Sequence, residues 1–186
     1  SRRQRQMCIR DSWKTVIQHI SSCKWVDQRR IVLWGTGLSG GYVLNLASEL
    51  KNISSIMVQV PFVDGAETAK IYPIQQLPKA LKLSSQDYMG AKVGLNPRTL
   101  PVVAQQQLSF FPTPDSYQGY LSIVNPDYYW SGEVPARALF QLIRYRPIQS
   151  VRDISIPVLF IVAKLDSLVP VSYRHLTLPT TPYACV

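Results

Sequence analysis

Residues 29–50 read RRIVLWGTGLSGGYVLNLASEL, and this stretch carries the clearest local pattern in the chain. A short apolar run at residues 31–34 stops at Gly35, and the turn that follows is rich in Gly and Ser. A helical pattern of apolar residues begins directly afterwards, over residues 42–47. Apolar β-branched runs favour strands, and a spacing of three or four residues favours helices. The stretch therefore predicts a strand, a tight turn and a helix.

Residues 37–41 (GLSGG) of this turn match the pattern G-x-S-x-G. The pattern is typical of a nucleophile elbow, in which a serine sits on a strained turn that only small flanking residues permit. It makes Ser39 a candidate nucleophile, with the amide of Gly40 as an oxyanion donor. Glycines between a strand and a helix also occur at phosphate sites and in structural turns. A phosphate site would need a lysine or an acidic partner that the sequence does not supply.

Two further apolar runs indicate a parallel sheet. Residues 53–62 (ISSIMVQVPF) follow the predicted helix, and residues 156–163 (IPVLFIVA) come later in the chain. A strand, a helix and a strand in quick succession indicate parallel pairing with a right-handed connection. Continuous apolar runs are typical of strands that are buried on both faces of a sheet. The sequence predicts an α/β fold with three parallel strands.

A carboxylate follows each of the two later strands: Asp64 after residues 53–62, and Asp166 after residues 156–163. Open α/β sheets place their sites at the carboxyl ends of the strands. Both aspartates are therefore candidate site residues. A helix cap or a turn cap is the structural alternative for Asp166.

The sequence between these strands has a different character, with many Pro and Gln residues from 66 to 150. Helical patterns appear at about residues 66–81, 84–90 and 133–144, and residues 100–111 look extended. Such a length is too great for a connection, so we predict an inserted, mainly helical cap over residues 66–150. The core fragment would then comprise residues 13–65 and 151–170. Its first helix is predicted over residues 13–23, with Ser12 as the N-cap.

The quoted segments resemble a bacterial and fungal branch of alpha/beta hydrolases that reads much like LWGTSFSGG, QVPFVDG, a capped insert with YRP, and IPVL..VA..D...P. The matching residues are 33–36, 39–41, 59–65, 145–147, 156–159 and Asp166. The resemblance implies a partial alpha/beta-hydrolase fold, in which the three strands are strands 5 to 7 of the full fold. It also implies a serine hydrolase of small-molecule ester, thioester or peptide-like bonds, without a cofactor or a metal. Asp166 would be the acid that orients the catalytic histidine, with Asp64 as the alternative.

The chain departs from this family at the elbow. Counted from Gly35, the family's nucleophile falls at Gly37, which has no hydroxyl group. In this register Leu38 supplies the oxyanion amide, and Ser39 fills a small position at the helix start. If the turn begins at Gly37 instead, Ser39 is the apex. The glycine pattern favours the second register and the strand spacing favours the first, so both stay open.

The two ends, residues 1–12 and 171–186, look like translated sequencing adapters, which flank genes assembled from environmental DNA. A basic arm for nucleic acid is the alternative for the first. His175 lies in the second and follows Asp166 by only nine residues, too few for the helix and strand that the family places there. The resemblance therefore predicts a chain that lacks its general base and is inactive as given. A hydrolase-fold binding protein that has lost its nucleophile is the alternative function.

Composition limits the possible partners. Without the two ends, five arginines and one aspartate are removed, and the net charge falls from +9 to +5. No cluster of basic and stacking aromatic residues remains, so we expect no nucleic-acid partner. The sequence has no run of about 18 apolar residues, so we expect no membrane span. Cys23 is then the single cysteine, which indicates a reducing, cytoplasmic compartment.

Overall fold

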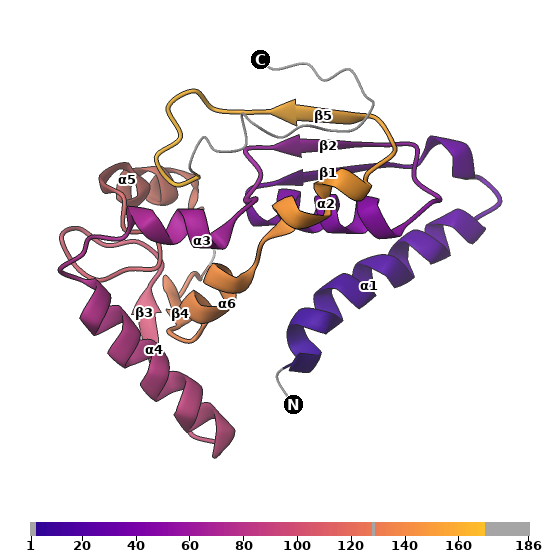
Figure 1. Cartoon of the computed structure of the whole chain (residues 1–186). Coiled ribbons are helices and arrows are strands. Elements are labelled where there is room, and N and C mark those ends of the chain that lie inside the picture. The colour runs from indigo at the N-terminus through magenta and orange to yellow at the C-terminus, as the bar shows by residue number, and fades with distance from the viewer. Residues whose placement is uncertain (1–2, 128, 170–186) are drawn as a thin grey trace. The chain divides into compact units, whose positions relative to one another are not determined.

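The computed structural model describes residues 3–127 and 129–169. The chain divides into two compact units, Ser1–Val63 with Pro147–Val186 as unit 1 and Asp64–Arg146 as unit 2. Figure 1 shows a sheet with helices in unit 1, and helices with two short strands in unit 2. None of the helices formed by the described residues is long and apolar enough to cross a membrane.

Unit 1 contains a parallel sheet of three strands: β1 (Val32–Thr36), β2 (Ser55–Gln59) and β5 (Val158–Ile161). Their order is β1-β2-β5, and both strand pairs are parallel. The predicted α/β fold with three parallel strands is confirmed. The strands align so that Thr36, Gln59 and Ile161 lie side by side. The carboxyl ends of all three strands therefore lie at the same end of the sheet.

One face of the sheet carries the core of unit 1. Side chains alternate between the faces of a strand, and Ile56 and Val58 of β2 point to the buried face. Helix α2 (Leu38–Glu49) packs on β1 and β2, and its Leu44 joins the same cluster. On β1 the alternate residues are open, because Val32 is 53% exposed and Trp34 is 62% exposed. The second face of β1 is therefore not covered by the described residues.

The first helix is longer than predicted. Helix α1 spans Arg3–Ser22, so Ser12 lies inside the helix and is not its N-cap. Residues 3–12 contain Arg, Gln and Met, which favour helices, and neither Gly nor Pro. Unit 1 also contains two short 3₁₀ helices, η1 (Gln28–Arg30) and η3 (Pro147–Asp153). The predicted adapter segment 171–186, with His175, lies outside the described residues.

Unit 2 contains helices and two short strands. They are α3 (Gly65–Thr68), η2 (Ala69–Ile71), α4 (Leu77–Lys92), β3 (Thr99–Pro101), α5 (Pro114–Ile123), β4 (Glu133–Pro135) and α6 (Ala138–Arg144). The helical segments predicted at 66–81 and 84–90 are helical in part, but the break falls at residues 72–76 and α4 continues through residues 82 and 83. The segment 133–144 divides into β4 and α6. Only β3 and isolated bridge residues of 100–111 are extended, and α5 was not predicted.

A buried ion pair holds unit 2 together. Asp87 of α4 is only 1% exposed. Its Oδ1 accepts hydrogen bonds from the amide of Arg98 at 2.9 Å and from Nη1 of Arg137 at 2.7 Å. Its Oδ2 accepts a third from the amide of Arg137 at 3.0 Å. These hydrogen bonds connect α4 to the segments that precede β3 and α6. Loss of a partner would leave a buried charge unpaired, which is costly.

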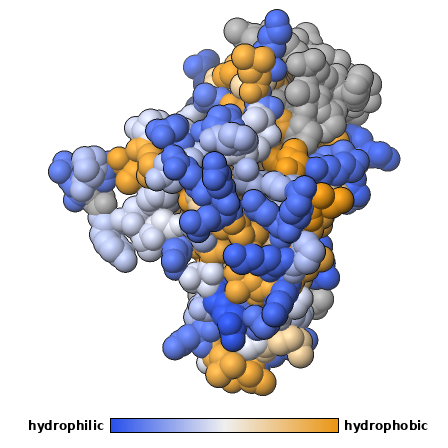
Figure 2. Space-filling view, turned by 90° about the vertical axis from the view of Figure 1, so that its left-hand side faces the viewer, coloured by the Kyte–Doolittle hydropathy of each residue, from blue (hydrophilic) through white to orange (hydrophobic). Residues whose placement is uncertain are grey.

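Unit 2 also exposes large apolar side chains. Leu81 and Met89 of α4 are exposed, as is Val93, where the helix ends. Figure 2 shows hydrophobic surface, in orange, between hydrophilic residues on the side of the molecule that it presents. Single exposed apolar residues are ordinary in folded proteins, so these alone do not define a site.

The outer strand β1 leads to a prediction about self-association. Among the described residues β1 pairs only with β2, so one of its edges has unpaired amides and carbonyls. Such an edge pairs readily with other chains, and a charged residue on it discourages the pairing. We expect the chain to self-associate, and Trp34→Lys to shift it toward monomer in size-exclusion chromatography with light scattering over a concentration series.

The matched control for this experiment is Leu165→Lys. Leu165 is 89% exposed and lies outside the strands, so the control removes an apolar side chain without changing the edge. An equal effect of both substitutions would show that general surface hydrophobicity, and not the edge of β1, drives association. A chain that is monomeric at all concentrations would contradict the prediction outright.

Candidate active site at the turn between β1 and α2

Gly37 is the apex of the turn that joins β1 to α2. Its φ is 53° and its ψ is −125°, a backbone conformation that is strained for residues with a Cβ atom. The amide of Gly37 donates to the carbonyl of Gln59 at 3.0 Å, and the amide of Phe62 donates to the carbonyl of Gly37 at 2.8 Å. These two bonds hold the apex against the carboxyl end of β2.

The turn is tight on both sides of this apex. A Cβ atom on Gly35 would lie 2.6 Å from the carbonyl oxygen of Ser39, and one on Gly40 would lie 2.9 Å from Cβ of Pro61. A Cβ on Gly37 would meet nothing within 4 Å. The neighbours must therefore be glycine because of close packing, whereas a side chain at position 37 has room.

Ser39 lies in the first turn of α2, and its hydroxyl group is used locally. Its Oγ donates to the carbonyl of Thr36 at 2.7 Å and accepts from the amide of Thr36 at 2.9 Å. These bonds connect the end of β1 to the start of the helix. The geometry corresponds to the register that begins at Gly35, and the assignment of Ser39 as nucleophile stays a prediction that this geometry does not favour.

Helix α2 presents amide groups at its start. The first amides of a helix have no acceptor within the helix, and the helix dipole makes this end positive. Leu38 is the first residue of α2 and directly follows the apex, so its amide is the one that this register predicts as oxyanion donor. Gly40 is buried, in close contact with Pro61.

Asp64 is a fully engaged carboxylate at the beginning of unit 2. It is 4% exposed and caps α3 by accepting hydrogen bonds from the amides of Ala66 and Glu67, at 2.9 and 3.3 Å. The guanidinium of Arg146 binds both carboxylate oxygens, with Nε at 3.0 and 3.1 Å and Nη2 at 2.7 Å. Burial alone would raise the pKa of Asp64, but these hydrogen bonds and the charge of Arg146 outweigh burial and hold the pKa below its ordinary value of 3.8.

Asp166 is engaged through one oxygen only. It follows β5 and is half-buried, and its Oδ1 accepts from the amides of Leu168 and Val169, both at 2.9 Å. No described residue donates a hydrogen bond to its Oδ2. Since β1, β2 and β5 end at one edge of the sheet, Asp166 and the Gly37 turn both follow that edge. Asp166 thus has an oxygen left to orient a further group.

The sequence did not reveal the partner of Asp64. Arg146 appeared only within the YRP match, and the two residues are 82 positions apart, too far for a local pattern to connect them. Among the residues that the structure describes, no group of three or more His, Cys, Asp or Glu side chains is placed to hold a metal ion.

A parallel sheet with a glycine-tight, positive-φ turn between a strand and a helix is the framework of the alpha/beta hydrolases. Solved structures agree. The alpha/beta hydrolase GrgF from Penicillium sp. sh18 matches 95% of this chain and 61% of its own, with a TM-score of 0.74 and 16% identity. A monoacylglycerol lipase from Paleococcus ferrophilus matches 96% of this chain and 63% of its own, with a TM-score of 0.58 and 14% identity. The chain has an alpha/beta-hydrolase fold.

Two curated proteins are similar in sequence. The quorum-quenching protein AidA from Acinetobacter baumannii (strain MDR-ZJ06) is 33% identical over 169 residues, which are 89% of this chain and 55% of AidA. An uncharacterized 31.7 kDa protein from the traX-finO intergenic region of Escherichia coli is 26% identical over 162 residues, 84% of this chain and 53% of its own length. The chain spans about half the length of these curated relatives. No protein-family model matches the sequence.

The hydrogen bonds of Asp64 predict a pH dependence of stability. Because its folded pKa lies below its ordinary value, the stabilising contribution is present above about pH 3.8 and is lost as the pH falls through the folded pKa. Asp64→Asn should lower the free energy of unfolding at pH 7 by about 1–3 kcal/mol, since it leaves Arg146 and two amides poorly paired. It should also reduce the loss of stability on acidification.

Urea unfolding at pH 7 and at pH 3 measures both effects. Asp153→Asn is the control, because Asp153 is exposed and its substitution changes the carboxylate count equally. If Asp64→Asn and Asp153→Asn change the pH dependence to the same extent, the ion pair does not contribute as we expect.

Proposed function

We propose that this chain is part of a hydrolase framework for ester, thioester or peptide-like bonds of small molecules, in which position 37 is the place of the nucleophile. The observation that carries the proposal is the conformation of Gly37, with a positive φ and open space where a side chain would stand. The hydrolases among the structural neighbours support the reaction class. Unit 2, which ends within the YRP match, would be the cap of this hydrolase. Cys23, a free half-buried cysteine, supports a cytoplasmic location.

Each residue of the proposed site would have a separate role in acyl transfer. A serine at position 37 would attack the substrate carbonyl carbon while a histidine removes its proton. The carbonyl oxygen then becomes negative, and the amide of Leu38 would donate to it at the positive end of α2. Asp166 would hold the histidine in the correct tautomer and stabilise its charged form. The leaving group would take the proton from the histidine, and water would release the acyl group in a second cycle.

The glycine at position 37 favours a second function on the same framework. Without a hydroxyl group the turn cannot form a covalent intermediate, but the amide of Leu38 would still bind a carbonyl oxygen. We propose that the chain, with the sequence that it has, binds a small ester-like ligand without cleaving it. The two functions share a site and differ in one side-chain oxygen.

Gly37→Ser tests the assignment of the nucleophile position. A fluorophosphonate probe should label the variant on residue 37 in the presence of imidazole as an added base. The labelling rate should be on the order of 10²-fold above the background rate of the unsubstituted chain. The backbone already has the conformation of an elbow, so only the hydroxyl group is missing. Mass spectrometry of the labelled peptide locates the adduct.

Ser39→Ala distinguishes the two registers. In the Gly37→Ser background it should leave labelling nearly unchanged, because the Ser39 hydroxyl only connects β1 to α2. Labelling of the unsubstituted chain on Ser39, lost in Ser39→Ala, would instead assign the nucleophile to Ser39. Circular dichroism checks that each variant is folded, since a residue other than glycine at positive φ costs about 1–3 kcal/mol.

The acid is tested in a longer protein that contains this segment, a serine at position 37 and a histidine base. Asp166→Asn should lower kcat for an activated ester by roughly 10⁴-fold without reducing stability, because the amide cannot stabilise the histidine in its charged form. Asp64→Asn should act mainly on the unfolding midpoint. A large loss of kcat from Asp64→Asn in a stable protein, with a mild effect of Asp166→Asn, would reverse the assignment.

A further inference from the structure

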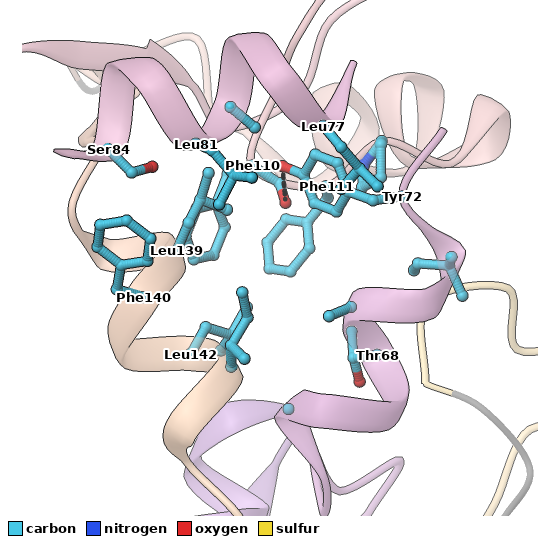
Figure 3. Close-up of a pocket in the computed structure, with 16 residues that line it drawn as sticks. Thr68, Tyr72, Leu77, Leu81, Ser84, Phe110, Phe111, Leu139, Phe140 and Leu142 are labelled. Atoms are coloured by element: carbon cyan, nitrogen blue, oxygen red, sulfur yellow. Dashed lines mark hydrogen bonds between the residues drawn. The ribbon is translucent and has the colours of Figure 1, made fainter. Parts of the chain in front are cut away.

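Unit 2 contains an apolar cavity of about 60 Å³, formed wholly by its own residues. Its walls come from α3 and η2, from α4, from residues 110–112 and from α6. Figure 3 shows the side chains of these elements converging, with Leu77 and Leu81 on one wall, Leu139 and Leu142 on another and the Phe110 and Phe111 rings near the middle. The two rings pack edge to face, with their centroids 4.9 Å apart.

The hydroxyl groups in the walls are already committed to the protein. Thr68 donates to the carbonyl of Asp64 at 2.9 Å, and Ser84 donates to the carbonyl of Ala136 at 2.9 Å. Tyr72 donates to main-chain carbonyls of residues 109 and 110, the second at 3.2 Å, and burial raises the pKa of this phenol. No charged side chain lines the cavity. The walls therefore present hydrocarbon, with no hydroxyl proton free for a ligand.

The cavity is larger than a packing defect and reaches the surface. Protein interiors contain few voids larger than a water molecule, and a water-sized group needs about 10–15 Å³ measured in this way. The space thus takes roughly four to six such groups. Two of its wall residues, Leu81 and Ile143, are 52% and 39% exposed, so a ligand has a route inward.

We infer that this cavity is a binding site for a small hydrocarbon group. The group is the alkyl end of a ligand, and about four to six of its carbon atoms fit in the cavity. Water in such a space would find no partners, and an apolar cavity that water avoids gains free energy when an alkyl group enters. A polar or charged ligand would lose hydrogen bonds with water and recover none. The inference depends on the walls of unit 2 alone and holds whether or not position 37 acts as proposed.

Hexan-1-ol and hexane-1,6-diol make a matched pair of probes, because the diol has the same chain with a second hydroxyl group at its far end. Titration of the complete chain, followed by amide shifts in isotope-edited NMR, should show hexan-1-ol binding with a Kd on the order of 1 mM. The diol should bind at least about tenfold more weakly, since one hydroxyl group must be buried without a partner. The shifts should cluster in residues 65–84 and 110–143.

Ala69→Leu fills the cavity, because Ala69 of η2 is a wall residue. It should weaken hexan-1-ol binding about tenfold or more. Ala91→Leu is the matched control on α4 outside the walls and should leave binding unchanged. If Ala69→Leu does not fold, as its NMR spectrum would show, Ile143→Trp at the exposed rim provides the same test and should also weaken binding. Equal binding of the two probes, shifts outside these segments, or unchanged binding to a folded, filled variant would each overturn the inference.

Discussion

The pairing of Asp64 with Arg146 is the constraint on which unit 2 depends. These residues are the first and last of the unit, and their bidentate ion pair closes a stretch of chain whose ends are 82 positions apart. Beside it the amide of Gly65 donates to the carbonyl of Tyr145 at 2.9 Å. A Cβ on Gly65 would lie only 1.8 Å from the carbonyl of Leu142, so no other residue allows this approach. Closing a long loop has an entropic cost that grows only slowly with its length, so a few contacts at its base can offset that cost. The cavity is formed by residues of the segment that these contacts close.

The two aspartates that follow the neighbouring strands β2 and β5 differ in how many hydrogen bonds they accept. Asp64 accepts from two amides and from Nε and Nη2 of Arg146, so both of its oxygens are used within its own unit. Asp166 accepts from two amides through a single oxygen. An acid that must orient a histidine needs a free oxygen at the edge of the sheet. The proposal for Asp166 therefore rests on its Oδ2, which accepts no hydrogen bond from the described residues, and not on how deeply either aspartate is buried.

The sequence predicted the elements that local patterns determine. The apolar runs predicted the three strands, and the small residues after residue 34 predicted the turn, because periodicity and backbone freedom act over a few residues. The register of the elbow could not be predicted in this way. Two glycine spacings fit the same sequence. The hydrogen bonds from Gly37 to Gln59 and from Phe62 to Gly37, which favour the register that begins at Gly35, depend on the neighbouring strand and have no local signal. The Asp64–Arg146 pair had no local signal, because its two residues are far apart in the sequence. Helix α5 was not predicted, because its sequence contains Pro, Gly and aromatic residues that do not favour a helix.

A glycine at the apex changes what the turn costs and what it can do. A residue with a Cβ in this conformation costs about 1–3 kcal/mol, which the packing of Gly35 and Gly40 and the bonds to β2 would have to offset. Glycine removes that strain and leaves the packing and the bonds in place. The turn thus keeps the amide of Leu38 at the start of α2 without the hydroxyl group that attack requires. If position 37 is the nucleophile position, as we propose, glycine there exchanges activity for stability and leaves the proposed carbonyl-binding amide in place.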